Sequence, residues 1–271
     1  MGFLGNALLA GSAIAVACGL IGWFVVLRRE VFAGDALSHV AFTGALAAAA
    51  AGLDLRVGLF VASVAVALLL AVLGGVSPSA RGSAEGTARA DDVSIGVVFV
   101  WVLGLGVLFL DLFNAGGAGA DGTIVARTLF GSIFGLSAGA ARLAAVLAAA
   151  TVLALGAIAR PLLFASIDAP LAAAGGVPVR GLGVAFLVLL GVVAAEATQA
   201  VGALLLLGLL AAPAGAAHRL TANPYRGMAL AAGIALASMW VGLALGYWIG
   251  ALPPGSAVIL VAGAVYGLTM V

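Results

Sequence analysis

The sequence predicts an all-α membrane protein with several membrane-spanning helices, and three observations support this fold class. Of the 271 residues, 65% are hydrophobic and only 8% are charged, whereas a soluble domain has about 25% charged residues. The charge-free runs reach the roughly 20 residues that a helix needs to cross about 30 Å of hydrocarbon. These runs are continuous, whereas the strands of a membrane β-barrel are alternating segments of roughly ten residues. A soluble domain and a barrel are therefore both excluded.

The apolar runs predict about eight or nine spans. The segment from Gly227 to Val271 carries no charge, and Pro253-Pro254-Gly255 breaks it near its middle, so it is predicted to be a helical hairpin. The stretch from Thr128 to Ser137 is expected to be a short re-entrant or surface helix, and the second and third spans could dip without crossing. The predicted spans are residues 5–27, 36–53, 57–76, 93–113, 139–159, 181–198, 200–217, 227–250 and 254–271.

The basic residues predict the orientation, because cytoplasmic loops are enriched in them. All 11 are arginine. Most fall in alternate loops, which predicts an external N-terminus and an internal C-terminus. The members of this cytoplasmic set are Arg28, Arg29, Arg81, Arg89, Arg160, Arg180, Arg219 and Arg226. The first apolar run precedes its basic residues and is expected to be a retained span. Its Cys18 is interpreted as a packing residue, and no basic stripe indicates nucleic-acid binding.

Asp35 and His39 are the first candidate functional pair. Their i, i+4 spacing places a carboxylate and an imidazole one turn apart on the same helical face. Ionisable groups at mid-bilayer cost about 2.5–3.5 kcal/mol each on insertion scales, so they usually meet a partner or line a water-filled path. A carboxylate oxygen and an imidazole nitrogen can together ligate Zn²⁺, Mn²⁺ or Fe²⁺. The alternative is that Asp35 caps the second span and His39 is hydrogen-bonded nearby.

Glu196 lies deep in a later apolar run, with Gln199 shortly after it. Three interpretations stay open for Glu196: a third metal ligand, a proton-bearing group, or a protonated carboxyl that is hydrogen-bonded to a neighbouring helix. His218, beside Arg219 at a predicted cytoplasmic span end, is interpreted as an interfacial residue. The other acidic residues considered are expected to be solvated near span ends or in loops: Asp54, Glu85, Asp91, Asp111 and Asp121.

The loop between Arg160 and Arg180 predicts a short helix. Asp168 precedes Ala169-Pro170, and proline is well tolerated in a first helical turn, so Asp168 is expected to cap a helix of residues 169–174 that stops at Gly175-Gly176. Such a cytoplasmic helix suits docking to another protein; the alternative is an ordinary interfacial turn. The chain has no lysine, so it lacks the GxxxxGK[ST] phosphate loop, and any ATPase must be another chain.

Several short motifs follow one another along nearly the whole chain. They are Gly34-Asp35-x3-His39, Asp92-x2-Ile95-Gly96, Leu129-Phe130-Gly131, the loop from Asp168 to Gly175, Gln199-Ala-Val201-Gly202-Ala-Leu204-Leu205, Ala212-Pro213-Ala214 and Leu252-Pro253-x-Gly255. No single motif is specific. Their order and spacing together resemble the permease subunits of zinc, manganese and iron ABC importers.

This resemblance implies one permease domain over residues 1–271, of the vitamin B12-importer type (the type II ABC importer fold), in the bacterial cytoplasmic membrane. It implies a homodimer surrounded by lipid, two cytoplasmic ATPase subunits, and an extracellular or periplasmic metal-binding protein. This chain is then not an enzyme and holds no permanent cofactor; the divalent metal is its cargo. By the same resemblance, Asp35 and His39 lie on the metal pathway. The implied coupling helix includes Asp168, Ala172 and Gly175.

Two other function classes stay open. In an ion-gradient-driven secondary transporter, Asp35, His39 and Glu196 would form a proton relay. An intramembrane enzyme such as a metalloprotease is less well supported, because the chain has neither HExxH nor GxSxG. The candidate ligands do not discriminate between Zn²⁺, Mn²⁺ and Fe²⁺, which accept overlapping oxygen and nitrogen ligands.

Overall fold

The computed structural model describes residues 2–75, 86–115, 129–203, 206–249 and 252–270. Every regular element in these ranges is helical, which confirms the predicted fold class. The chain divides into two compact units. Unit 1 comprises Met1–Val31, Asp121–Val152 and Val193–Val271, and unit 2 comprises Phe32–Ala120 and Leu153–Val192. Each unit is assembled from separate segments, and the single permease domain over residues 1–271 stays a prediction.

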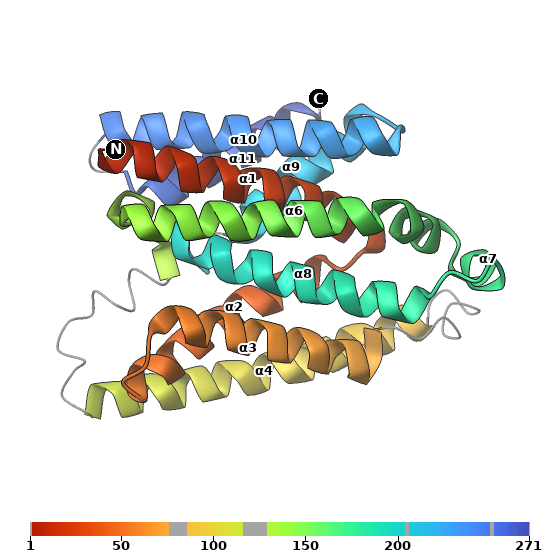
Figure 1. Ribbon diagram of the computed structural model, residues 1–271, viewed down its shortest axis with the longest axis horizontal. Helices are drawn as coiled ribbons and strands as arrows, with labels where there is room; N and C mark the ends of the chain where they lie inside the picture. Colours follow the sequence, from red (N-terminus) through yellow and green to blue (C-terminus); the bar gives the residue numbers. More distant parts are fainter. Residues whose placement is uncertain (1, 76–85, 116–128, 204–205, 250–251, 271) are drawn as a thin grey trace. The chain divides into compact units, whose positions relative to one another are not determined.

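Within the described residues, seven helices are long and apolar enough to cross a membrane; their labels are given in Figure 1. They are α1 (Phe3–Arg28), α2 (Val31–Ala50), α3 (Leu55–Leu70, with the span continuing to Leu73), α4 (Gly86–Ala115, with the span over Val93–Asn114), α6 (Ala138–Ile167), α8 (Val179–Ala200) and α10 (Pro224–Trp248). A further, shorter apolar helix is α11 (Pro254–Leu268). Both it and α9 (Leu206–Leu220) have 15 residues, which is about 22 Å of helix. The multi-span prediction is confirmed, and the break at Pro253-Pro254 separates α10 from α11 as expected.

Several predicted boundaries were wrong, among them the end of α6 at Ile167 rather than residue 159 and the starts of α2 and α9. α2 begins at Val31 rather than at residue 36. The span predicted to begin at residue 200 begins at Leu206, because the backbone turns at Gly202, whose φ is +100°. A Cβ at Gly202 would lie 2.5 Å from the Phe130 carbonyl carbon. The left-handed backbone and this close approach both require glycine, and the turn interrupts an apolar run that looks continuous in the sequence.

In unit 1, α1 lies beside α9 and α10, and α11 lies beside α9 and α10 (Figure 1). Small residues make these approaches close. A Cβ at Gly19 on α1 would lie 2.6 Å from the Ala231 oxygen on α10, and a Cβ at Gly22 would collide with the Leu210 oxygen on α9. Lipid offers no hydrophobic force between helices, so such backbone contacts hold a helical bundle together.

The segment predicted as a helix from Thr128 to Ser137 contains a short 3-10 helix, Ile133–Gly135, in its described part; Thr128 lies outside the described residues. The Ser132 backbone N–H donates to the Gln199 oxygen at 3.3 Å. The Asn6 side-chain amide donates to the Leu136 oxygen at 3.4 Å. This segment is therefore packed against α1 and the end of α8.

In unit 2, α2 is held between α3 and α4. Gly44 on α2 and Gly58 on α3 meet backbone to backbone, so that a Cβ on either would collide with the other's carbonyl oxygen. On the other side, the buried Thr43 hydroxyl donates to the Val102 carbonyl oxygen of α4 at 3.2 Å. Asp54 caps α3 by accepting from the Arg56 backbone N–H at 2.8 Å. These contacts position the helix that carries Asp35 and His39.

Candidate metal pathway and coupling helix

The entry to α2 is a tight connection from α1. Arg29 has a left-handed backbone with φ 60°, and the Glu30 backbone N–H donates to the Val25 oxygen at 2.9 Å. The Arg28 guanidinium pairs with the Glu30 carboxylate, Nη2 to Oε1, at 2.9 Å. Because α2 already begins at Val31, Asp35 lies inside the helix, and the alternative that it caps the second span was wrong.

Asp35 and His39 lie one turn apart on α2, and both are half-buried. The His39 imidazole meets the Phe99 ring of α4 edge to face, with ring centroids 5.3 Å apart and planes at 68°. Phe99 also meets Phe32, at 5.9 Å and 68°. An imidazole packed against an aromatic ring has a restricted orientation, and the pair places one carboxylate and one imidazole on the same face of α2.

The aromatic support of His39 was missed from the sequence. Phe32 precedes His39 by seven residues, which is two helical turns, and this spacing could have placed both on one face. Phe99 comes from a different helix, and no local pattern in the sequence connects it to His39.

Glu196 lies on α8 and belongs to unit 1, whereas the Asp35–His39 pair belongs to unit 2. Among the described residues, no group of three or more His, Cys, Asp or Glu side chains could hold a metal ion. Glu196 is 2% exposed, and neither carboxyl oxygen has a hydrogen-bond partner in the described part of the chain. Cys18 on α1 is also buried.

His218 makes a structural contact between α9 and α1. Its ring stacks on that of Trp23, with centroids 4.8 Å apart and planes at 13°, and its Nε2 lies 3.0 Å from the Trp23 carbonyl oxygen.

The sequence predicted that the remaining acidic residues lie near span ends or in loops, and the structure agrees for only some of them. Asp54 is a helix cap and Asp111 is exposed on α4. Asp91 lies within α4, so its assignment to a loop was wrong. Glu85 and Asp121 lie outside the described residues.

The short helix predicted after Asp168 is present as α7 (Ala169–Ala174). The Asp168 carboxylate accepts from the Leu171 backbone N–H at 2.9 Å, and the Gly175 N–H donates to the Leu171 oxygen at 3.0 Å. Ala172 is fully buried on the inner side of this helix, whereas Leu171 is 58% exposed. α7 therefore presents one apolar side chain outward from a capped helix.

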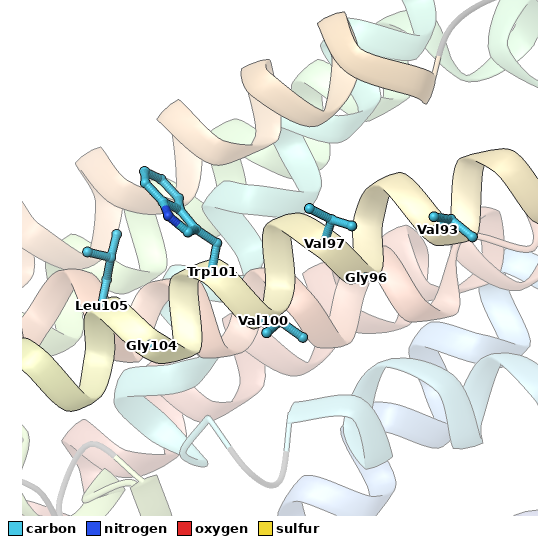
Figure 2. Close-up of a pocket in the computed structure, with 7 residues that line it drawn as sticks. All are labelled: Val93, Gly96, Val97, Val100, Trp101, Gly104 and Leu105. Atoms are coloured by element: carbon cyan, nitrogen blue, oxygen red, sulfur yellow. The ribbon is translucent and has the colours of Figure 1, made fainter.

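A shallow groove runs along α4, and Figure 2 shows the side chains that line it. It contains no acidic, histidine or cysteine residue, so it offers no metal ligand. The lining residues are Val93, Gly96, Val97, Val100, Trp101, Gly104 and Leu105. Within the helix from Val93 to Asn114, only 11% of the most apolar segment is buried, so this face is available to lipid or to another membrane helix.

A helical membrane bundle with an ionisable pair on one span and a capped helix between two others has the architecture of a transporter's membrane subunit. The chain belongs to the ABC 3 transport family, which matches residues 1–271. It is therefore a multi-pass permease subunit of a metal ABC importer and not an enzyme, since ATP hydrolysis resides in a separate chain. The resemblance that the ordered motifs indicated is confirmed.

Two curated relatives illustrate the match. The chain is 27% identical to the manganese import system permease protein ScaB of Streptococcus parasanguinis, covering 95% of this chain and 86% of that protein. It is 28% identical to the manganese transport system membrane protein MntC of Halalkalibacterium halodurans, covering 98% and 86%. Among solved structures, PsaBC from Streptococcus pneumoniae in complex with Fab matches with a TM-score of 0.83 and 26% identity, covering 100% of this chain and 92% of that one.

Proposed function

We propose that this permease carries Mn²⁺ through the bacterial cytoplasmic membrane, driven by ATP hydrolysis in two associated cytoplasmic ATPase subunits. The observation that carries the proposal is the Asp35–His39 pair, a carboxylate and an imidazole on one face of α2 with the imidazole held against Phe99. Mn²⁺ accepts carboxylate and water readily, together with imidazole. The names of the two manganese relatives support this choice over Zn²⁺ and Fe²⁺.

In this proposal, Asp35 and His39 bind the metal ion transiently as it passes through the membrane. A passing ion must exchange its water for protein ligands, and a lining of alanine, leucine and glycine cannot replace those bonds. One subunit supplies one such pair. In a two-fold homodimer each residue occurs twice, so up to four ligating groups surround a central path if the two α2 helices line the dimer axis. Water completes the coordination of the ion.

The helix α7 is the proposed site at which the ATPase binds the permease. Its Asp168 cap, its buried Ala172 and its closing Gly175 make it a rigid projection, and the exposed Leu171 offers apolar contact. The Mn²⁺ arrives from an extracellular or periplasmic binding protein. The apolar, largely exposed face of α4 supports contact with lipid or with the second copy.

The test is Mn²⁺ uptake into vesicles that contain the permease, its ATPase and the binding protein. Asp35→Ala and His39→Ala are expected to lose uptake while the complex still assembles and hydrolyses ATP. Asp111→Ala is the matched control, because Asp111 is an exposed acidic residue on α4, and it is expected to retain uptake. Wild-type uptake in both α2 variants would refute the site. Uptake by the permease alone under an ion gradient would instead identify a secondary transporter.

A further inference from the structure

Glu196 is a buried acidic side chain whose polar atoms have no partner among the described residues. Both carboxyl oxygens lack a hydrogen bond there, and the side chain is 2% exposed. The flanking Ala195 and Ala197 are fully buried. The nearest hydroxyl in the sequence, on Thr198, donates instead to the Ala194 carbonyl oxygen at 2.7 Å. The carboxyl group is therefore buried without the hydrogen-bond donors that an anion needs.

The described surroundings also supply no cation to Glu196. The ion pair in this part of the chain joins Arg28 to Glu30, and the Arg219 Nε donates to the Thr269 oxygen at 3.1 Å. An unpaired carboxylate in an apolar interior is strongly disfavoured relative to its neutral form. A protonated carboxyl is thus the form that this site accommodates.

The titratable groups on the neighbouring helices do not change this conclusion. Cys18 on α1 is also buried. The other titratable or charged side chains on the described helices of unit 1 are Arg28 on α1, Arg142 on α6, His218 and Arg219 on α9, Tyr225, Arg226 and Tyr247 on α10, and Tyr266 on α11. None of them makes a hydrogen bond or ion pair with Glu196 in the described structure.

We propose that Glu196 is a proton-binding site of the permease, which holds a proton in this conformation and releases it to water in another state of the transport cycle. Glu196 does not ligate the transported metal in this scheme. On ionisation the O–H bond breaks, the electron pair stays on the carboxylate, and water accepts the proton. The proposal rests on the transport cycle of the proposed importer.

The absence of an acceptor is what separates this proposal from a purely structural role. A structural carboxyl would donate its proton to a neighbouring oxygen, whereas an unsatisfied buried polar group costs about 1–3 kcal/mol. An apolar side chain of similar size would fill the same space at lower cost. Buried polar groups without partners are unusual in native structures, and a state in which water reaches Glu196 would satisfy its carboxyl group.

The first experiment is infrared spectroscopy of the permease–ATPase complex in lipid at neutral pH, in H₂O and in D₂O. A protonated-carboxyl C=O band that shifts in D₂O is expected in the wild type and should be missing in Glu196→Gln. Glu30→Gln is the matched control, because Glu30 is a poorly exposed glutamate with an unpartnered Oε2 but an ion pair to Arg28; this variant should retain the band. A wild type without the band, or a band that survives in Glu196→Gln, would overturn the proposal.

The second experiment repeats the spectrum with the ATPase locked in its nucleotide-bound state by vanadate. The Glu196 band is expected to decrease, and an unchanged band would rule out proton release.

In uptake assays, Glu196→Gln is expected to leave the KM for Mn²⁺ unchanged, since loss of a metal-site residue raises the KM roughly tenfold or more. A rise of that size would make Glu196 a ligand. Absence of ATP-driven Mn²⁺ uptake would contradict the proposed function. The Glu196 band in the resting state is measured without transport, so it tests the proton-binding proposal separately.

Discussion

Gly58 offers a direct test of the packing that positions the candidate metal ligands. It lies on α3 against the backbone of α2, and a Cβ at this position would collide with the Gly44 oxygen and lie 2.6 Å from the Ala48 Cβ. To reach an ordinary carbon–carbon separation of about 3.5 Å, the two helices would have to move apart by roughly 1 Å. Overpacking of this kind costs about 1–3 kcal/mol.

Gly58→Ala is therefore expected to lower the thermal unfolding midpoint of the detergent-solubilised permease by about 2–10 °C. Mn²⁺ uptake should fall as well, because α2 carries Asp35 and His39. Gly104→Ala is the matched control: a Cβ at Gly104 on α4 would meet no atom within 4 Å, and alanine favours a helix over glycine. Equal midpoints for Gly58→Ala and the wild type, or an equal loss in Gly104→Ala, would refute the close-packing argument.

Two further variants test single hydrogen bonds. Thr43→Val removes the hydroxyl that donates to the Val102 oxygen and is expected to lower the free energy of unfolding by about 1 kcal/mol. Thr43→Ser should retain the hydrogen bond and the stability. A Val variant as stable as the wild type would contradict the prediction. Asp168→Ala removes the side chain that accepts from the Leu171 N–H, is expected to destabilise α7 by about 1 kcal/mol and should reduce ATP-driven uptake. Asp168→Asn should preserve the cap and the uptake. Equal uptake in the wild type and both variants would remove the docking role.

Local interactions explain which parts of the fold were predictable. Asp168, Pro170 and Gly175 lie within one six-residue helix or at its caps, and their backbone preferences specify α7 without help from the rest of the chain. The Pro253-Pro254 break is equally local. In contrast, the start of α9 depends on Gly202, whose close approach to Phe130 brings together residues far apart in the sequence.

Some features of the candidate site were likewise predictable from local sequence, and others depended on packing between helices. The i, i+4 spacing of Asp35 and His39 is a property of the helix that contains them, so the sequence alone predicted their shared face; their role as metal ligands stays a prediction. The contact between His39 and Phe99 depends on the packing of α2 against α4. For Glu196, the sequence left a ligand, a proton carrier and a structural carboxyl open, and the missing partners became visible only in the packed unit.

By itself, the sequence determined that this chain is a helical membrane protein, where most of its spans lie, and which few ionisable groups the spans contain. Hydrocarbon thickness and the cost of an unpaired backbone group act on each segment separately, so composition along the chain is sufficient for those conclusions. The tertiary structure decided which glycines touch another backbone, which ring supports His39, and that Glu196 has no partner among the described residues. These properties depend on atoms that come from different helices, and no periodicity within one helix records them.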